Sequence, residues 1–284
     1  MGCSDELRSQ ILIEALPYIQ KYNGKIVVIK YGGHAMLDED LKKAVMGDIV
    51  LLSLVGMKVV LVHGGGPEIS DMLARLGKQS EFIDGLRVTD EETAEIVQMV
   101  LCGKVNKDLV KHINGVGGKA IGLSGIDHSL LEAEAMDDRL GFVGNITHVN
   151  TGPIMDLLEH GYIPVISTVA CDSAGAVYNV NADTAAAKIA EVLKAESFIS
   201  MTDTRGILQQ KDDESTLISE IKLDQAPALL ESGVLSGGMI PKVESCLASI
   251  REGVNRVFVI DGRVPHGLLI EMLTDSGVGT MFTR

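Results

Sequence analysis

Positive charge is scarce in this sequence. Its 25 Lys and Arg residues stand against 39 Asp and Glu residues, which leaves a net charge of −14 at pH 7. Because basic patches bind the phosphate backbone of nucleic acids, this balance argues against a nucleic-acid partner. Any anionic ligand must therefore be bound by a few placed cations and by backbone N–H groups, since the chain has no general positive field.

Paired cysteines and long apolar runs are also missing. The four cysteines are far apart and form no CxxC pair, so they indicate neither a zinc site nor a disulfide framework. We therefore expect a reduced, cytoplasmic setting. No apolar run is long enough to span a bilayer, and the acidic N-terminal segment is unlike the basic start of a signal peptide. We expect no membrane partner.

Several familiar catalytic motifs are absent. The chain has no Walker A pattern, no HRD or DFG set, no GxSxG elbow and no His/Cys cluster with metal-ligand spacing. Residues 115–120 match the loose GxGxxA form of a dinucleotide fingerprint, but these glycines precede a predicted strand instead of following one. This context disfavours a nicotinamide-dependent oxidoreductase.

Two apolar segments that end in glycines are present instead. Ile26–Ile29 is a continuous apolar run, which is typical of a strand covered by helices on both faces, and Lys30 and then Gly32–Gly33 follow it. A second apolar strand, 57–62, runs into Gly64–Gly66. A plain strand and turn would explain the first segment alone equally well. The repetition favours one anion site at the carboxyl ends of two neighbouring strands, where glycines let the backbone approach a ligand closely.

The rest of the chain alternates helix and strand, which predicts an α/β fold. The expected helices are 4–23, 38–55, 66–76, 90–108, 153–160, 183–194, 224–231, 239–253 and 265–273. The expected strands are 25–30, 57–62, 120–123, 162–166, 196–201 and 254–260, with hairpins at 82–88, 140–149 and 171–180. We expect Thr89 to cap the helix from Asp90, and a boundary between two α/β halves near 178–182.

The N-terminal helix has a predicted defect. Ser4 suits its N-cap, and Pro17 removes a backbone hydrogen bond and predicts a kink near Leu16. This helix precedes the first strand and is not needed for a βα unit. It is either a cover over the core or an arm that packs on another subunit.

Two further polar segments lie at predicted helix starts. Asn179–Asp183 precedes an Ala-rich helix, where a cap with a favourable acid is a strong alternative to a binding role. Ser236–Lys242 has Gly237 and Gly238 at a helix start, with the lysine in the first turn, an arrangement suited to phosphate.

Together these motifs resemble the amino acid kinase family, and within it the branch that phosphorylates N-acetyl-L-glutamate. The segments that carry the resemblance are KYGGHAM (30–36), VHGGGP (62–67), GLRVT (85–89), YNVNAD (178–183), MTDTRGI (201–207) and GGMIPK (237–242). They cover essentially the whole chain in the family's order. The resemblance implies a three-layer αβα sandwich around a mainly parallel sheet, with an N-terminal oligomerisation helix (1–23), a substrate-binding and dimer-forming N-lobe (24–180) and an ATP-binding C-lobe (181–284).

The resemblance also implies roles for individual residues in phosphoryl transfer from ATP to a side-chain carboxylate. The implied catalytic residues are Lys30, Lys242 and Asp183. The implied substrate-binding residues are Gly64, Gly65, Arg87 and Asn179. The implied ATP-binding residues are Gly32, Gly33, Thr202, Asp203, Gly206, Gly237 and Gly238. Mg²⁺ would be bound by the ATP phosphates, with no protein metal site.

A subtype is implied as well. The kinked N-terminal helix and a C-terminal Gly-x-Gly signature resemble the arginine-inhibited members, which are hexamers built as trimers of dimers. The positions implied near an L-arginine site are Tyr18, Lys222, Asp275, Gly277 and Gly279. Asp275 departs from the family's usual Glu or His. The residues leave open whether a nitrogen-signalling protein docks on the surface.

The rival functions within the family are kinases for carbamate, aspartate, glutamate or UMP. Arg87 in GLRVT and the NVNAD run favour N-acetylglutamate over these substrates. A catalytically silent arginine sensor on the same fold is a rival from another class, which the presence of Lys30, Asp183 and Lys242 disfavours.

Overall fold

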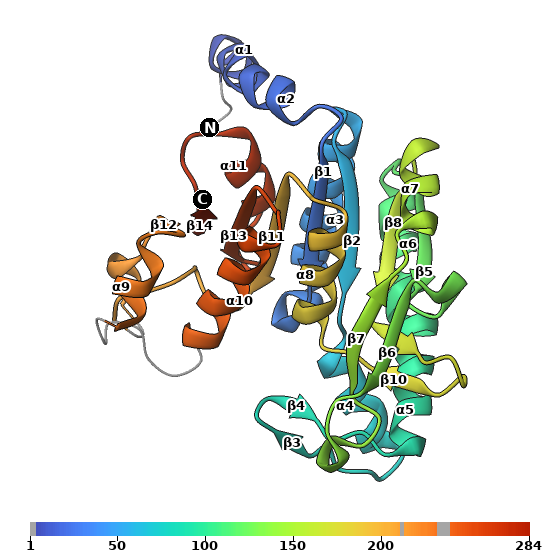
Figure 1. Cartoon of the computed structure of the whole chain (residues 1–284). Coiled ribbons are helices and arrows are strands. Elements are labelled where there is room, and N and C mark those ends of the chain that lie inside the picture. The colour runs from blue at the N-terminus through green and yellow to red at the C-terminus, as the bar shows by residue number, and fades with distance from the viewer. Residues whose placement is uncertain (1–3, 211–212, 232–238) are drawn as a thin grey trace.

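A computed structural model describes residues 4–210, 213–231 and 239–284. The strands of its main sheet are β1 (Ile26–Tyr31), β2 (Lys58–His63), β5 (Ala120–Ser124), β8 (Ile163–Ser167), β11 (Ser197–Thr202), β12 (Glu220–Lys222), β13 (Arg256–Asp261) and β14 (Thr280–Thr283). These eight strands lie in the order β12-β14-β13-β11-β1-β2-β8-β5 (Figure 1). Every neighbouring pair is parallel except β13 with β14. The predicted mainly parallel sheet is confirmed.

Helices cover both faces of this sheet, which explains the continuous apolar run of β1. Val27 and Ile29 lie in one hydrophobic core with Ile49, whereas Val28 lies in a second core with Ala186. The first core takes residues from α3 (Glu39–Leu54), α4 (Gly66–Arg75), α5 (Glu91–Gln98), α6 (Asn106–Gly115) and α11 (Gly267–Leu273). The second takes residues from α7 (Gly152–Glu159), α8 (Ala182–Val192) and α10 (Met239–Arg251). The three-layer sandwich is therefore confirmed.

Two smaller sheets lie beside the carboxyl ends of β1 and β2. One consists of β6 (Leu131–Ala135), β7 (Gly144–Val149), β9 (Val169–Cys171) and β10 (Val177–Asn179), in the order β10-β9-β6-β7. The other is the hairpin of β3 (Phe82–Ile83) and β4 (Leu86–Arg87). The predicted hairpins at 82–88 and 171–180 are confirmed.

The predicted hairpin at 140–149 is wrong. Gly144 is not in a turn but begins β7, which pairs antiparallel with β6. A Cβ at Gly144 would lie 2.7 Å from Cβ of Tyr178, so this glycine allows close packing between strands. The sequence pattern correctly indicated that a glycine is needed at position 144, but the reason is close packing between strands and not a turn.

The predicted cap of the helix from residue 90 is wrong by one residue. Asp90 is the N-cap of α5, and its carboxylate accepts a hydrogen bond from the Thr93 N–H. Thr89 is fully buried, and its hydroxyl donates to the Arg87 carbonyl at 2.8 Å. Helix α5 then continues through a π-helical segment, η2 (Met99–Val105), into α6.

The N-terminal helix is broken as predicted. It consists of α1 (Asp5–Glu14) and α2 (Leu16–Tyr22), separated at Ala15, and Ser4 caps α1 by accepting from the Leu7 N–H. Helix α1 has no buried residue and projects from one end of the molecule (Figure 1). The remaining helix is α9 (Ala226–Glu231), and short 3₁₀ turns are η1 (Gly33–Met36), η3 (Asp127–Ser129), η4 (Asp138–Leu140) and η5 (Glu214–Thr216).

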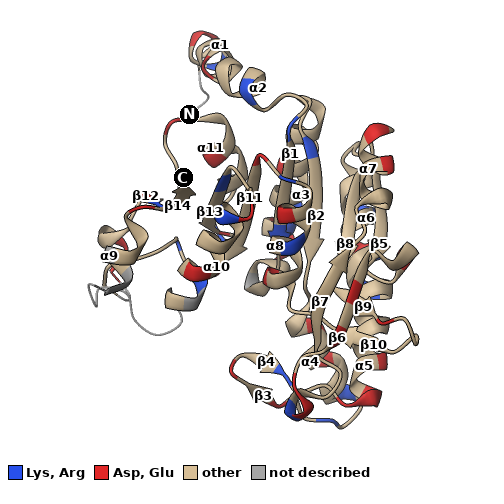
Figure 2. Cartoon of the chain, in the orientation of Figure 1, with Lys and Arg blue, Asp and Glu red and all other residues tan. Residues whose placement is uncertain are grey.

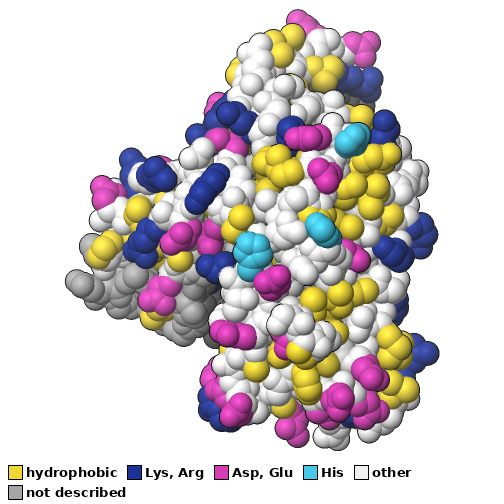
Figure 3. Space-filling model, turned by 45° about the vertical axis from the view of Figure 1, so that its right-hand side comes forward, with side chains coloured by type: hydrophobic (Ala, Val, Ile, Leu, Met, Phe, Trp, Pro, Cys, Tyr) yellow, Lys and Arg dark blue, Asp and Glu magenta, His cyan; other side chains and the backbone are white. Residues whose placement is uncertain are grey.

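Basic and acidic residues are interspersed along the elements (Figure 2). The face in Figure 3 likewise shows acidic and basic groups side by side, with small hydrophobic groups between them. Any strong positive potential must therefore be local. Within the described residues, no helix has the length and apolar character needed to cross a membrane.

Candidate active site

A pocket of about 250 Å³ opens at the carboxyl ends of β1 and β2. The predicted site residues that line it are Lys30, Gly32, Gly33, Gly64, Gly65, Arg87, Asn179 and Asp183. The strand register pairs Tyr31 with His63, so the two glycine segments begin side by side. The structure thus brings together the two segments that the sequence analysis linked.

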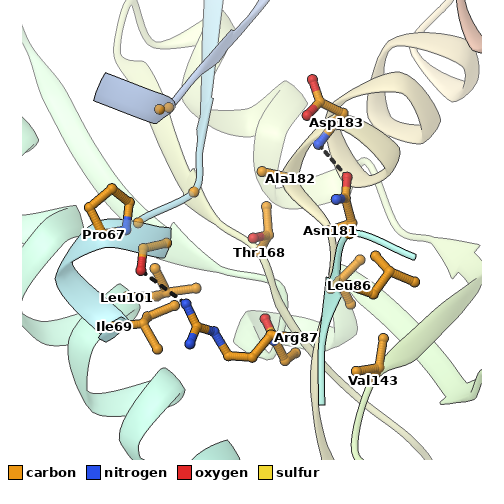
Figure 4. A pocket seen from close by; sticks show the side chains of 18 of the residues that line it. Pro67, Ile69, Leu86, Arg87, Leu101, Val143, Thr168, Asn181, Ala182 and Asp183 are labelled. Atoms are coloured by element: carbon orange, nitrogen blue, oxygen red, sulfur yellow. Dashed lines mark hydrogen bonds between the residues drawn. The ribbon is translucent and has the colours of Figure 1, made fainter. Parts of the chain in front are cut away.

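Asp183 lies at the upper end of the pocket as drawn in Figure 4, and it is paired there with a lysine. Lys30 is only 8% exposed, and its Nζ lies 3.2 Å from Oδ2 of Asp183 and 3.4 Å from the Met201 carbonyl. The Asp183 backbone N–H donates to Asn181, the cap of α8, and its Oδ1 accepts from Ser200. Asp183 is therefore fixed in position by both its backbone and its side chain.

Lys242, in the first turn of α10, belongs to the same charge cluster. Burial lowers the pKa of its ammonium group, whereas the nearby Asp183 carboxylate raises that pKa and Lys30 lowers it. Lys242 therefore lies close enough to Asp183 and Lys30 for the charges of both groups to act on its ammonium group. The structure thus brings the three predicted catalytic residues together from β1, α8 and α10.

The opposite end of the pocket carries Arg87, on β4 (Figure 4). Its guanidinium donates to the Gly66 carbonyl at 3.0 Å and to Oγ of Ser70 at 2.9 Å, and it also contacts Ser80. The Phe82 ring lies 4.8 Å below it. Arg87 is 7% exposed, and this burial lowers its pKa. Among the described residues no carboxylate forms an ion pair with Arg87, and an ordered guanidinium of this kind suits a carboxylate ligand.

Asn179 is connected to Arg87 through a buried hydroxyl. Its Nδ2 donates to Oγ1 of Thr89 at 3.2 Å, and that hydroxyl donates to the Arg87 carbonyl. The sequence analysis missed Thr89 as part of this end because its position before a helix suggested a cap.

The sequence analysis also missed the wall of the pocket. Leu86, Leu101, Val143 and Ile69 supply apolar surface, and Thr168 supplies a buried hydroxyl. These residues come from different elements and share no sequence motif. Of these five residues, only Thr168 has a sequence position that could have suggested a place in the site, because it directly follows a buried strand.

One predicted backbone donor is already engaged. The Gly64 N–H donates to the Tyr31 carbonyl at 3.1 Å, as part of the contact between β1 and β2. Among the described residues, no acceptor binds the Gly65 N–H, and Gly65 precedes the first turn of α4. Of the two glycines, Gly65 is therefore the one with a backbone donor to offer.

The predicted nucleotide residues lie at the carboxyl end of β11, next to β1. Asp203 lies against the first glycine segment, because a Cβ at Gly33 would be 2.9 Å from its Oδ1. The Thr202 hydroxyl donates to the Thr204 carbonyl, and Gly206 lies against Thr280. Gly237 and Gly238 lie outside the described residues. Within residues 4–210, 213–231 and 239–284, no group of three His, Cys, Asp or Glu side chains could bind a metal ion.

A second pocket, of about 670 Å³, lies between α2 and the C-terminal segment. Tyr18, Asp275, Gly277 and Gly279 line it, and the Tyr18 hydroxyl donates to the Asp275 carboxylate, which raises the Tyr18 pKa. Lys222 does not line this pocket, although its strand β12 contributes Glu220. The sequence analysis missed Glu271, whose carboxylate accepts from the Val278 N–H at 2.8 Å and whose pKa burial raises.

Comparisons with known proteins agree with this arrangement. The family model described as "Amino acid kinase family" matches residues 25–261. The acetylglutamate kinase of Brachyspira hyodysenteriae is 56% identical over 99% of this chain and 98% of its own length. That of Caldanaerobacter subterraneus is 55% identical over 98% of this chain and 94% of its own length.

Solved structures are similar as well. An N-acetylglutamate synthase from Neisseria gonorrhoeae, complexed with coenzyme A and N-acetyl-glutamate, superposes with a TM-score of 0.85 at 26% identity over 97% of this chain. This chain spans only 63% of that protein. The Giardia carbamate kinase shares the fold, with a TM-score of 0.67 at 16% identity over 92% of this chain and 99% of that one. The chain belongs to the amino acid kinase family, in which its relatives at 52–56% identity are acetylglutamate kinases.

Proposed function

We propose that this chain transfers the γ-phosphoryl group of ATP to the side-chain carboxylate of N-acetyl-L-glutamate. The product, N-acetyl-L-glutamyl 5-phosphate, belongs to the second step of arginine biosynthesis. The observation that carries this function is the 56% identity to an acetylglutamate kinase over 99% of the chain. The pocket supports it, because a charge cluster and an arginine lie at opposite ends of one small cavity.

The reaction needs electrostatic help more than proton transfer. The attacking carboxylate, with an ordinary pKa of about 4.3, is already ionised near neutral pH. Its oxygen forms a bond to the γ-phosphorus, and the bond from that phosphorus to the bridging oxygen of ADP breaks. The barrier comes from the approach of two anions, so catalysis requires positive charge and in-line positioning.

Lys30 and Lys242 supply that charge in our proposal. Lys30 forms an ion pair with Asp183, and the charge of the same carboxylate also acts on Lys242, so one negative charge is shared between two ammonium groups. Asp183 acts as a positioning residue that orients the two ammonium groups. The Gly65 N–H, at the start of α4, adds a backbone donor for negative charge at the same end.

Substrate binding is assigned to the opposite end. Arg87 has a planar fork that matches the α-carboxylate, and Asn179 offers amide groups for the acetamido end. The apolar wall of Leu86 and Val143 suits the methylene groups and the acetyl methyl group.

ATP is assigned to the segments at the carboxyl ends of β1 and β11. Gly32 and Gly33 leave room for phosphate oxygens near Lys30, and Thr202, Asp203 and Gly206 border the nucleotide. In the proposal Gly237 and Gly238 lie near the phosphates. Mg²⁺ would be bound by the ATP phosphates and would neutralise charge as the phosphoryl group moves.

The test is an ATP-dependent hydroxamate assay with N-acetyl-L-glutamate, Mg²⁺ and hydroxylamine, which traps the acyl phosphate. We expect hydroxamate with N-acetyl-L-glutamate and little with carbamate, aspartate or glutamate. Hydroxamate formed only from one of those rival substrates would overturn the assignment. No product from any of them would favour a non-catalytic sensor.

We further propose that L-arginine binds in the second pocket and inhibits the enzyme. Tyr18 and Asp275 join the N-terminal helix to the C-terminal segment there, so a ligand could alter the position of α2. A structural neighbour, the Neisseria gonorrhoeae N-acetylglutamate synthase, has been crystallised with coenzyme A and L-arginine. Tyr18→Phe should raise the arginine concentration for half-inhibition, and unchanged inhibition would argue against this pocket.

The N-terminal helix is proposed to assemble dimers into a cytoplasmic hexamer. Ile11, Leu12 and Ile13 of α1 are exposed, as expected for an arm that packs on another subunit. Deletion of residues 1–23 should leave active dimers. A truncated protein that stays hexameric by light scattering would rule this out.

A further inference from the structure

His63, the last residue of β2, carries contacts that no part of the proposed mechanism uses. It is fully buried. Its Nδ1 lies 2.8 Å from the Gly64 carbonyl oxygen, and its Nε2 lies 3.1 Å from Nδ2 of Asn106. A polar ring at this depth is costly unless both nitrogens are paired, and here both are.

The partners fix which nitrogen carries the proton. A carbonyl oxygen can only accept, so Nδ1 carries hydrogen and donates to Gly64, and Nε2 accepts from the Asn106 amide. Burial lowers the pKa of His63 to about 4, so the ring is neutral near pH 7. One tautomer of a neutral imidazole therefore satisfies both contacts.

Asn106 is itself fixed by backbone carbonyls of two other strands, β5 and β8. The two hydrogens of its Nδ2 are shared among His63 Nε2, the Val165 carbonyl at 2.9 Å and the Leu123 carbonyl at 3.2 Å, and its Oδ1 accepts from Lys107. Asn106 is the first residue of α6, directly after the π-helical segment η2. The His63 ring is thus connected to β5, β8 and α6.

The Gly64 carbonyl determines the direction of the next N–H. In a planar trans peptide, the C=O of one residue and the N–H of the following residue point in opposite directions. Binding the Gly64 oxygen to the buried ring therefore turns the Gly65 N–H away from that ring. Gly65 lines the pocket, and no acceptor among the described residues binds its N–H.

Glycine alone would not fix this peptide. Only glycine fits at position 65, because a Cβ there would lie 2.7 Å from Leu101. Without a side chain, however, the backbone at this position is less restrained. A rotated 64–65 peptide would present a carbonyl oxygen to the reacting anions instead of a donor.

We propose that His63, oriented by Asn106, is a positioning residue that fixes the 64–65 peptide so that the Gly65 N–H faces the reacting carboxylate and phosphoryl group. This rests on the proposed function. Its expected contribution is to kcat, because a preoriented donor acts on charge that develops during the reaction.

Two substitutions separate positioning from simple packing. In His63→Asn, the amide nitrogen can take the place of Nδ1 and donate to Gly64, while the contact with Asn106 is lost. In His63→Gln, the amide oxygen can take the place of Nε2 and accept from Asn106, while the contact with Gly64 is lost. Each variant leaves a buried group unpaired, so both should lower the melting temperature.

We expect kcat to fall about 10- to 100-fold in His63→Gln and less than about 3-fold in His63→Asn, with the KM for ATP unchanged in both. Equal kcat losses in the two folded variants, or wild-type kcat in His63→Gln, would overturn the proposal. The wild-type hydroxamate assay separately tests the reaction itself.

A measurement on the unmodified protein covers the case of a variant that fails to fold. The ¹⁵N shifts of the histidine rings distinguish Nδ1–H from Nε2–H tautomers. We expect one histidine to remain a neutral Nδ1–H tautomer from pH 8 to pH 6, and to be the signal missing from a His63→Asn spectrum. An Nε2–H tautomer or a ring that titrates near pH 6.5 would contradict the proposal.

Discussion

The two ends of the active-site pocket hold their functional groups by different means. At one end, Lys30, Asp183 and Lys242 form a cluster of charges whose members influence one another directly. At the other end, Arg87 and Asn179 are fixed by hydrogen bonds to neutral hydroxyl and carbonyl groups. One end is organised by charge and the other by hydrogen-bond geometry.

This difference matches the role that the proposed mechanism gives to each end. Negative charge is rearranged where the phosphoryl group moves, so cations there stabilise the transition state more than the bound substrate. The remote end of the substrate does not change during the reaction, so contacts there contribute equally before and during it. Substitutions at the first end should therefore lower kcat, and substitutions at the second should raise KM.

The largest expected effect is at the charge cluster. Lys242→Met keeps the length of the side chain and removes its charge, and we expect kcat to fall about 100- to 1,000-fold with a small change in KM for N-acetyl-L-glutamate. Steady-state kinetics in the hydroxamate assay measure this. Lys43→Met, at an exposed lysine of α3, is the matched control. A rise in KM with unchanged kcat would place Lys242 in substrate binding instead.

The next effect concerns pH. Burial lowers the Lys242 pKa, and the Asp183 carboxylate raises it. Asp183→Asn removes that support, so the Lys242 pKa should fall further. Since the protonated amine is the active form, the alkaline limb of the kcat profile should move to lower pH, and kcat at neutral pH should fall about 10-fold.

Ser200→Ala is the control for this pH effect. It removes the hydrogen bond from Ser200 to Asp183 but keeps the carboxylate charge. Its alkaline limb should stay near that of the wild type. A limb that moves equally in both variants would show that orientation, and not charge, sets the Lys242 pKa.

At the remote end, Arg87→Lys should act on binding. A lysine keeps the charge but cannot form the paired hydrogen bonds of a guanidinium with a carboxylate. Loss of one charged hydrogen bond corresponds to about a 10- to 100-fold higher KM for N-acetyl-L-glutamate. The KM for ATP and the kcat of this variant should stay near wild type. The matched control is Arg75→Lys, on the exposed surface of α4, in which kcat and the KM for both substrates should stay near wild type. A kcat loss as large as that of Lys242→Met would erase the contrast between the ends.

The charged end could be predicted from the sequence more fully than the neutral end. Lys30 lies near the carboxyl end of β1 and Gly64 directly follows β2, both strands contain a continuous apolar run, and parallel strands bring their carboxyl ends together. This geometry needs only local patterns. What the pattern could not reveal is that the Gly64 N–H is used by the Tyr31 carbonyl, since that depends on strand register.

The neutral end depends on contacts between distant residues. Thr89 has the sequence position of a helix cap, but its hydroxyl is buried between Arg87 and Asn179, ninety residues further along the chain. The pairing of β7 with β6 was missed for a similar reason, because Gly144 is required by its packing against Tyr178. The local sequence indicated that a hydroxyl at position 89 and a glycine at position 144 have a structural role, but it could not indicate the distant residues that they contact.

The smallest expected effect is at Thr89, and it separates geometry from packing at the neutral end. Thr89→Val keeps the shape of the side chain and removes the hydroxyl that joins Arg87 to Asn179. Asn179 should then lose its orientation. The KM for N-acetyl-L-glutamate should rise about 5-fold, which corresponds to the loss of one neutral hydrogen bond. Thr89→Ser keeps the hydroxyl and loses a buried methyl group, which should lower stability by about 1 kcal/mol and leave KM near wild type. Thermal unfolding and steady-state kinetics of the two variants test this together. If KM instead followed stability, and Thr89→Ser were the more impaired in binding, packing and not the hydroxyl would organise this end of the pocket.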